Sequence, residues 1–413
     1  MSLPKLFEVD IRHASHRLAS PVEALGEELG GLSLAGRLKP GQRVAVTAGS
    51  RGITGIAQLL QTVVAFLRKQ GAEVFIFPAM GSHGGATADG QTAMLAHLGV
   101  TAESLGAPIR SSTETVMIGT SDEGVPVHQD RQAHEADWVV VVNRVKRHTG
   151  FSGLTGSGLL KMLSIGMGKP TGAKFVHSFG PVLGYENAIQ SAGRTALHKT
   201  NILFGVALVE DAFGETAEVR VCGPERFQQT DRELLARSLT MMPRLPVEDI
   251  DLLIVDWMGK NISGTGMDTH TIGRLRTLGS PRPTSPRVKR VFVRDLTPES
   301  GGNAIGIGLA DFTTDRLVEK MDYAATCTNC LTSMSPEQAQ IPIHYASDRE
   351  CIDRALGAIG PASAELRIVR IQDTSHLSRV VVSEAVLDEL RGRDDVSVSE
   401  QASWAFDDDG KLL

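Results

Sequence analysis

The sequence predicts an α/β protein built of two α/β domains. Its 413 residues exceed the size at which a single hydrophobic core usually stops growing. Between residues 43 and 79 a strand, a loop, a helix and a second strand follow one another, and such a crossover implies a parallel sheet. The same alternation restarts near residue 250, after a linker that contains Pro243 and Pro246. We therefore expect an N-terminal domain over residues 1–246 and a C-terminal domain over residues 247–413.

The elements of the first half follow from their hydrophobic patterns. The run RVAVTA (43–48) is apolar and predicts a buried strand, and IAQLLQTVVAFLRKQ (56–70) has the spacing of an amphipathic helix. A second strand is expected at 72–79, and a short strand and a helix before the turn at Pro40 and Gly41. The later elements are a helix from Thr87, a hairpin over 116–127, a strand at 138–142, a helix over 185–198, a strand over 202–211 with a hairpin partner over 217–223, and a helix over 225–242.

The second half repeats this organisation. Strands are expected over 250–259, 288–296 and 365–373, helices over 311–321 and 348–359, and a strand and helix over 380–386. The C-terminal tail is a candidate for returning to the first domain. Because small-molecule sites often form where domains meet, we expect the active site in the cleft between the two domains, with the C-terminal domain closing it.

Composition and charge narrow the class of protein. A hydrophobic content of 41% and a charged content of 22% are those of an ordinary globular protein. The net charge of -6 argues against nucleic acid or an anionic membrane as a partner. No apolar run reaches the length of a membrane span, and the first residues lack the apolar core of a signal peptide, so we expect a cytoplasmic protein. Four cysteines in so long a chain indicate reduced thiols rather than a disulfide framework.

Reactive side chains follow the first two strands of the crossover. Ser50 and Arg51 come after the first strand and His83 after the second, and functional groups gather at the carboxyl ends of parallel strands. The planar guanidinium of Arg51 can hold a phosphate or a carboxylate, although a solvated surface arginine is an equally ordinary interpretation. His83 is flanked by Ser82 and Gly84, which are too small to bury it. This accessible imidazole is suited to proton transfer near neutral pH.

A glycine-rich stretch from residue 144 to residue 178 carries three more candidates: His148, Lys161 and His177. Its seven glycines indicate tight turns or a backbone pressed against a ligand. Apolar neighbours favour an uncharged, nucleophilic amine at Lys161, and a helix lysine that reaches to water is the alternative. The histidine spacing matches no zinc motif, and neither the dinucleotide motif nor the P-loop is present.

One candidate lies in the second half. Lys260 and Asn261 follow the strand at 250–259 and precede Gly264 and Gly266. A lysine at this position can hold an anionic substrate. The alternative is a turn that Asn261 and the polar residues after it stabilise.

Taken together, these residues resemble the lactate racemase family. The resemblance rests on order and spacing: Arg51, the G-S-H-G loop at 81–84, the series of His148, Lys161 and His177, and the run WMGKNISGTGMD at 257–268. It covers most of the chain and is strongest over residues 43–180 and 250–275. Members of this family use the nickel-pincer nucleotide (pyridinium-3,5-bisthiocarboxylic acid mononucleotide nickel), whose sulfur groups hold a nickel ion.

The resemblance implies how the cofactor is held. Lys161 resembles the lysine that joins the nucleotide covalently, and His177 resembles the histidine that completes the coordination of nickel. Thirteen positions separate His148 from Lys161, which is more than in the family. Lys169 and Lys174 are therefore alternatives for the anchoring lysine.

The resemblance also implies the catalytic and binding roles. His83 and His148 resemble the two catalytic histidines on either face of the substrate. Ser50 and Arg51 stand beside the cofactor, Arg51 also beside the substrate, and Lys260 stands where the family places a substrate-binding lysine.

The implied function is that of an isomerase, a racemase or epimerase of a 2-hydroxy acid. It would work by proton-coupled hydride transfer to the lysine-tethered nucleotide. Family members carry H-R-P from the first catalytic histidine, where this chain has His83, Gly84 and Gly85, so lactate itself is not implied. The implied partners are a small 2-hydroxy acid and the enzymes that make the cofactor. A chain produced without those enzymes would lack the cofactor.

Two other functions fit the same residues. The first is a metal-dependent hydrolase or lyase that uses His83, His148 and His177 around an ordinary divalent ion. The second is a non-catalytic protein that binds a small anion.

Overall fold

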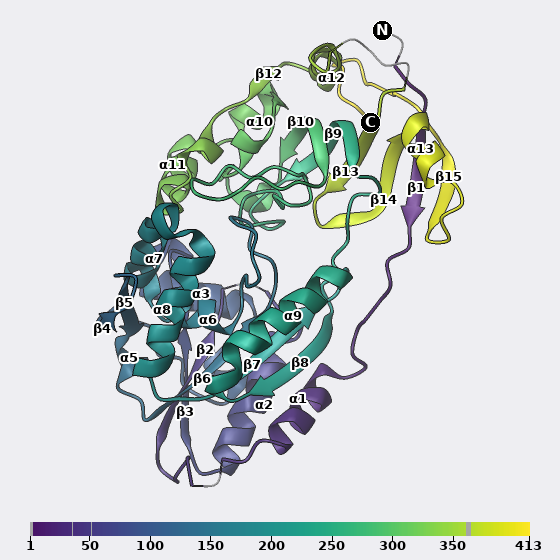
Figure 1. The fold of residues 1–413 in the computed structure, drawn as a ribbon. Helices are drawn as coiled ribbons and strands as arrows, with labels where there is room; N and C mark the ends of the chain where they lie inside the picture. Colours follow the sequence, from purple (N-terminus) through teal and green to yellow (C-terminus); the bar gives the residue numbers. More distant parts are fainter. Residues whose placement is uncertain (1–2, 35, 51, 361–364) are drawn as a thin grey trace. The chain divides into compact units, whose positions relative to one another are not determined.

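The computed structural model describes residues 3–34, 36–50, 52–360 and 365–413, and these form two α/β units. The N-terminal unit comprises residues 14–242, and the C-terminal unit comprises residues 1–13 and 243–413 (Figure 1). Each unit contains a sheet with parallel strands and packed helices. The predicted α/β class is confirmed.

A five-stranded sheet forms the centre of the N-terminal unit. Its order is β3 (Glu73–Pro78), β2 (Arg43–Ala48), β6 (Trp138–Arg144), β7 (Ile202–Glu210) and β8 (Thr216–Cys222). The first four strands are parallel, and β8 runs antiparallel to β7. The carboxyl ends of β2, β3, β6 and β7 therefore meet at one edge of the sheet.

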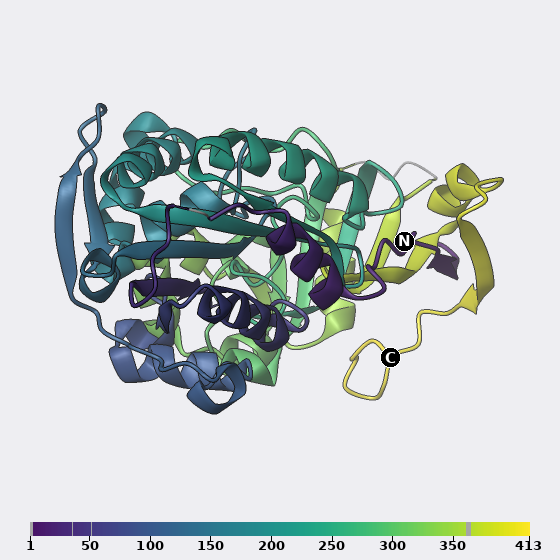
Figure 2. The ribbon, with the colours of Figure 1, turned by 90° about the horizontal axis from the view of Figure 1, so that it is seen from below.

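Helices cover both faces of this sheet, as Figure 2 shows. Val140 and Val142 of β6 pack with the helices of one face, and Val139 and Val141 pack with those of the other, as the alternation of a strand requires. The first face carries α1 (Pro21–Gly30), α2 (Ile56–Lys69), α3 (Ala88–His97) and α4 (Ala102–Leu105). The second face carries α5 (Arg131–His134), α6 (Leu159–Lys161), α7 (Lys169–Leu183), α8 (Tyr185–Lys199) and α9 (Phe227–Met241).

The predicted hairpin in this unit is also present. β4 (Thr115–Thr120) and β5 (Pro126–Asp130) form a separate two-stranded antiparallel sheet, which packs against α7 and α8. Between α6 and α7 the chain makes a π-helical turn, Met162–Gly166. All five residues of this turn are buried, so the connection between the two helices is part of the core.

An eight-stranded sheet forms the C-terminal unit. Five neighbouring strands, from β12 to β13, are parallel, and β14, β1 and β15 extend the sheet by antiparallel pairing. The order is β12 (Ile343–Tyr345), β11 (Phe312–Thr314), β10 (Arg287–Leu296), β9 (Asp249–Met258), β13 (Ile368–Asp373), β14 (His376–Ser383), β1 (Leu6–Ile11) and β15 (Val396–Ala402). The helices of this unit are α10 (Asp315–Glu319), α11 (Tyr323–Thr332), α12 (Asp348–Gly357) and α13 (Glu384–Leu390).

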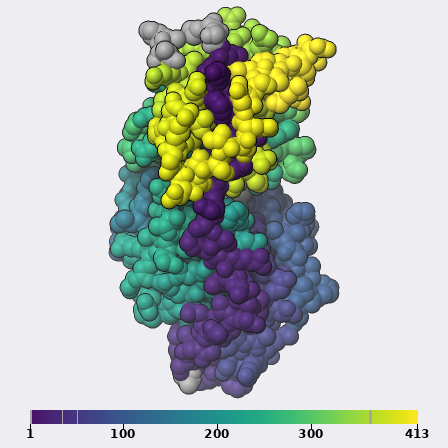
Figure 3. All heavy atoms as spheres, turned by 90° about the vertical axis from the view of Figure 1, so that its right-hand side faces the viewer, coloured from purple at the N-terminus to yellow at the C-terminus, as the bar shows by residue number. Residues whose placement is uncertain are grey.

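The first strand of the chain belongs to this C-terminal sheet. β1 pairs with both β14 and β15, and Figure 3 shows the purple N-terminal residues between the yellow C-terminal ones. Val9 and Ile11 are buried in the same core as Val380 and Val382 of β14. The predicted N-terminal domain began at residue 1, whereas β1 belongs to the C-terminal unit. The sequence of a six-residue strand indicates that it pairs with other strands, but it does not show which ones.

One helix prediction in the second half is wrong in part. Residues 312–314 of the expected helix 311–321 form the strand β11, parallel to β10. Thr314 then caps α10, because its side chain accepts a hydrogen bond from the backbone of Leu317. Within the described residues, none of the helices is both long and apolar enough to cross a membrane.

Candidate functional site

The loops after three neighbouring strands carry Ser50, His83 and His148. Because β2 lies between β3 and β6, the loop that holds Ser50 is flanked by the segments that hold His83 and His148. Ser50 Oγ and His83 Nδ1 are directly hydrogen-bonded. All three side chains are only partly buried, so a small ligand can reach them. Arg51, which was predicted on the same loop, lies outside the described residues.

Two buried side chains fix the loop between β3 and His83. Gln91 of α3 donates through Nε2 to the backbone oxygens of residues 80 and 81, at 3.1 and 3.0 Å. Lys169 Nζ donates to the backbone oxygen of Pro78 at 2.7 Å and to Gln91 Oε1 at 2.5 Å. Neither Gln91 nor Lys169 is exposed to solvent. The position of His83 therefore depends on a hydrogen-bonded core that comes from α3 and α7.

The three candidate anchoring lysines differ in their surroundings. Lys169 is fully buried, its Nζ also lies 3.9 Å from Asp130 Oδ2, and burial lowers the pKa of Lys169 to about 8. Its amine is used to hold the fold. Lys174 is exposed on α7. Lys161, which is partly buried at the end of α6, is the candidate that combines access with a fixed backbone.

A carboxylate fixes the start of the helix that carries Lys161. Asp231 of α9 is buried, and it accepts hydrogen bonds from the backbone N–H groups of Leu159 at 2.8 Å and Leu160 at 3.0 Å. These N–H groups begin α6, where a helix has no internal acceptors for them. Burial raises the pKa of Asp231 to about 6, because it disfavours the charged form. The side chain of Asn143 also donates to Gly158 O at 2.6 Å, which ties α6 to the end of β6.

Aromatic rings connect His148 with His177. The ring of His148 stacks on Phe151 with centroids 4.5 Å apart, and Phe151 stacks on Tyr185 at 6.5 Å. Tyr185 in turn lies 6.4 Å from the ring of His177, on α7. Phe151 and Tyr185 are nearly fully buried, and the two histidines at the ends of the series are partly exposed. The buried rings of Phe151 and Tyr185 therefore pack against both imidazole rings and restrict their positions.

The backbone also fixes the form of the His148 ring. The N–H of Gly150 donates to His148 Nδ1 at 2.9 Å. A nitrogen that accepts a hydrogen bond carries no proton, so the neutral ring of His148 carries its proton on Nε2.

Three glycines of this stretch pack closely against other parts of the protein, and the expected contact of the backbone with a ligand stays a prediction. A Cβ at Gly158 would lie 2.3 Å from Asp231 Oδ1, and a Cβ at Gly153 would lie 2.0 Å from Glu186 Oε2. At Gly156 the obstacle is the backbone oxygen of Lys146, at 2.3 Å. These glycines allow segments of the unit to approach closely.

Lys260 lies in the C-terminal unit, after β9. Its Nζ donates to the backbone oxygen of Gly264 at 3.0 Å and to Asn329 Oδ1 at 2.9 Å. The same loop is closed by the N–H of Gly259, which donates to Gly266 O at 2.9 Å. The structure contains both expected features, a lysine at the end of a strand and a structured turn. The role of Lys260 in substrate binding stays a prediction.

The chain was compared with known proteins. Residues 11–169 match the family model described as the lactate racemase N-terminal domain. The resemblance to the lactate racemase family is confirmed. The matched range contains His83, His148 and Lys161, and His177 lies just beyond it.

A solved structure shows the same fold. It is the lactate racemase apoprotein from Thermoanaerobacterium thermosaccharolyticum, with a TM-score of 0.51 and 14% sequence identity over 94% of this chain and 96% of that chain. At this identity the likeness concerns the fold alone. A comparison with curated protein sequences gave no match.

Sequence reasoning missed the residues that support the site. Gln91 lies inside a helix of ordinary composition, and Asp231 reads as a surface carboxylate of a helix. Lys169 was noticed only as an alternative to Lys161. For Asp231 the available signal was weak: a polar residue on the buried face of a helix. For Gln91 there was no such signal, because its helix has no clear apolar face.

Proposed function

We propose that this protein is an isomerase, a racemase or epimerase that acts on a 2-hydroxy acid with the lysine-tethered nickel-pincer nucleotide. The match to the lactate racemase N-terminal domain supports a racemase. The observation that carries the proposal is the placement of His83 and His148 after β3 and β6, on either side of the β2 loop. Inversion requires the hydride to return to C2 on the opposite face, and the hydroxyl group of each enantiomer needs its own proton acceptor; one histidine on each side of the substrate would supply it.

The two imidazoles are held in ways that suit complementary roles. The neutral ring of His148 carries its proton on Nε2, and it can hydrogen-bond a hydroxyl or carbonyl oxygen of the substrate. Ser50 Oγ can accept the Nδ1 proton of His83, which leaves Nε2 of His83 as the base that takes the hydroxyl proton of the substrate. For the opposite enantiomer His148 would be the base, and for this its ring has to give up the hydrogen bond from Gly150 N–H so that the proton can sit on Nδ1. As the resemblance implies, Arg51 and Lys260 are each proposed as substrate-binding residues.

Residues of the N-terminal unit are proposed to hold the cofactor. Lys161 is the proposed covalent anchor, and Ser50 and Arg51 are proposed to lie beside the nucleotide. His177 is the proposed nickel ligand, since an imidazole with soft sulfur donors suits this metal. The bound nucleotide would supply the hydride acceptor that the reaction needs, because no protein side chain can accept a hydride from C2.

The donor set favours this proposal over the metal-dependent hydrolase. Among the described residues no three His, Cys, Asp or Glu side chains converge to hold a metal ion, so His83, His148 and His177 do not form an ordinary divalent site. A nickel ion held mainly by its nucleotide needs one protein ligand. An anion-binding protein without chemistry would not need two histidines in defined hydrogen-bonded settings.

The proposal is tested with protein produced together with the cofactor-making enzymes. Single enantiomers of several 2-hydroxy acids, each deuterated at C2, are incubated with the protein, and the products are resolved by chiral chromatography and mass spectrometry. We expect inversion of at least one acid with deuterium kept at C2, because the hydride returns to the carbon it left. Loss of deuterium to water would indicate proton abstraction and contradict the proposal. Binding without inversion that survives His83→Ala and His148→Ala would favour the anion-binding protein.

A further inference from the structure

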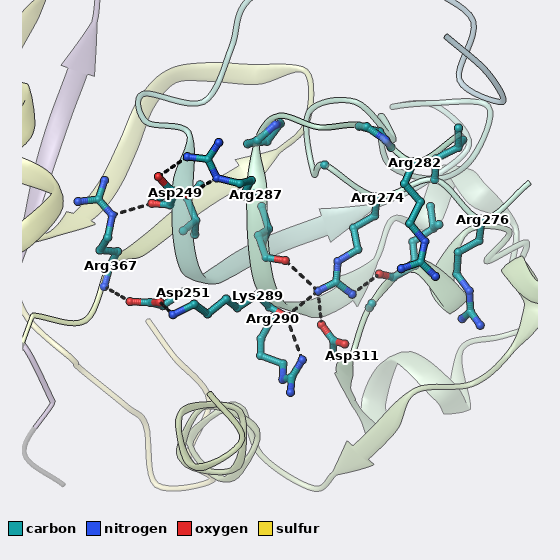
Figure 4. Close-up of a pocket in the computed structure, with 18 of the residues that line it drawn as sticks. Asp249, Asp251, Arg274, Arg276, Arg282, Arg287, Lys289, Arg290, Asp311 and Arg367 are labelled. Atoms are coloured by element: carbon teal, nitrogen blue, oxygen red, sulfur yellow. Dashed lines mark hydrogen bonds and ion pairs between the residues drawn. The ribbon is translucent and has the colours of Figure 1, made fainter. Parts of the chain in front are cut away.

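A pocket of about 780 Å³ opens in the C-terminal unit, at the amino ends of β9 and β10 (Figure 4). Asp249 and Asp251 of β9 and Arg287 and Lys289 of β10 line it. This edge of the sheet is opposite the carboxyl end of β9 that leads to Lys260, and nothing in the proposed racemase site uses it. The lining contains seven cationic side chains and three carboxylates.

Each of the three carboxylates that line the pocket forms an ion pair with a cationic side chain of the lining. Arg287 makes a two-point contact with Asp249, with Nε to Oδ1 at 2.6 Å and a terminal nitrogen to Oδ2 at 2.5 Å. Lys289 Nζ lies 2.7 Å from Asp251 Oδ1. Arg274 pairs with Asp311 Oδ2 at 2.7 Å in the same way, and Figure 4 shows its guanidinium at the centre of the wall.

The remaining arginines leave an excess of positive charge. Arg276 donates to the backbone oxygen of Gly308 at 2.7 Å, and Arg290 donates to the backbone oxygen of Ala358 at 2.8 Å. These carbonyl groups orient the guanidinium groups but do not neutralise them. In the part of the chain that the structure describes, no carboxylate pairs with Arg276, Arg282 or Arg290. A chain whose net charge is -6 thus gathers unneutralised cations in one pocket.

Clustered like charges repel one another, and a bound anion relieves this repulsion. Arginine presents several N–H donors in a plane, which match the oxygens of a phosphate group. More than one unneutralised guanidinium favours a ligand with more than one negative charge over a monocarboxylate. Between the charges, the partly exposed ring of Pro283 supplies aliphatic surface for the organic part of a ligand.

We propose that this pocket binds a small organic phosphate, with Arg276 and Arg282 as its principal phosphate contacts. The pocket volume lies within the range of small-molecule sites, about 300–1,000 Å³. The proposal concerns the C-terminal unit by itself and stands whether or not the racemase activity is found.

Isothermal titration calorimetry on the full chain tests the proposal. The probes are adenosine 5′-diphosphate, sodium pyrophosphate and sodium phosphate, each at low and at high salt. We expect a Kd for adenosine 5′-diphosphate well below about 1 mM, weaker binding of inorganic phosphate, and loss of affinity with added salt.

Matched variants assign the binding to the pocket. In R276Q/R282Q the affinity should fall by about tenfold or more, since charge-assisted hydrogen bonds are lost. R379Q/R391Q removes the same charge from exposed positions of this unit outside the pocket, and its affinity should equal that of the unmodified chain. Circular dichroism confirms that both variants are folded.

Three results would overturn the proposal. One is the absence of binding below about 1 mM for all three probes. Another is an equal affinity of R276Q/R282Q and R379Q/R391Q. The last is equal affinity for inorganic phosphate and adenosine 5′-diphosphate, which would show that the organic part is not recognised.

Discussion

Replacing Gly158 with alanine should destabilise the N-terminal unit at the start of the helix that carries Lys161. The new Cβ would lie 2.3 Å from Oδ1 and 2.5 Å from Cγ of Asp231, which is closer than real Cβ contacts. The carboxylate cannot move away without losing its hydrogen bonds to Leu159 N and Leu160 N, at 2.8 and 3.0 Å. Each hydrogen bond to a charged group contributes about 1.5–3 kcal/mol, so the loss of both should lower the free energy of unfolding by about 3–6 kcal/mol.

Urea denaturation followed by circular dichroism measures this loss, with the transition of the N-terminal unit analysed separately. Gly26→Ala is the matched control. Gly26 is exposed inside α1 and an added Cβ meets nothing within 4 Å, so this variant should keep or gain up to about 1 kcal/mol. If Gly158→Ala is as stable as Gly26→Ala, Asp231 does not hold the start of α6 in the way described.

Three further predictions concern charge and chemistry at the same site. Burial raises the pKa of Asp231 from 3.8 to about 6, so between these values the native chain keeps a proton that the unfolded chain loses. Relative to Asp231→Asn, stability should fall by about 3 kcal/mol in all as pH rises from well below 3.8 to well above 6, and equal pH profiles in urea titrations would refute this. The lowered pKa of Lys169, about 8 against 10.5, has the opposite consequence: relative to Lys169→Met, stability should rise between pH 8 and 10.5, when the buried amine becomes neutral before the unfolded one does. His83→Ala and His148→Ala should each reduce inversion of the substrate by about 10²–10⁴-fold without changing the amount of bound cofactor, and unchanged rates would exclude them as the catalytic pair.

Local pattern was enough to predict most of the elements. The strand, helix and strand over residues 43–79 appear as β2, α2 and β3, because an apolar run and an amphipathic period leave little choice of structure. The helix near Thr87 is capped by that residue, whose side chain accepts a hydrogen bond from Gly90 N. The residues placed after these strands, Ser50 and His83, are in direct contact.

Non-local pairing could not be predicted in the same way. β1 carries the alternation of a half-buried strand, but its partners lie more than 360 positions away in β14 and β15. Thr313 and Thr314 look like helix residues until the neighbouring β10 is in place to bond them. Lys169 donates hydrogen bonds to Gln91 and to the backbone of Pro78. These residues are far apart in the sequence, so their contact could not be predicted from it.

The glycine density between residues 144 and 178 is compatible with close packing inside the protein and with close contact to a ligand. Glycine density indicated close approach to the backbone, and the close approach is present. The approaching groups are Asp231, Glu186 and the backbone of Lys146, all from the protein itself. These three glycines therefore show how closely the segments before Lys161 pack, and contact of the stretch with a ligand stays a prediction.

The most direct measurement is the mass and nickel content of the chain produced together with the cofactor-making enzymes. We predict one added nucleotide, found on the peptide that contains Lys161, with about one nickel ion per chain. Lys161→Arg should lose the added mass, and Lys174→Arg should keep it. His177→Ala should keep the added mass but hold less nickel, since one protein ligand is removed. A chain that carries neither added mass nor nickel, or that carries the nucleotide on another lysine, would contradict the account.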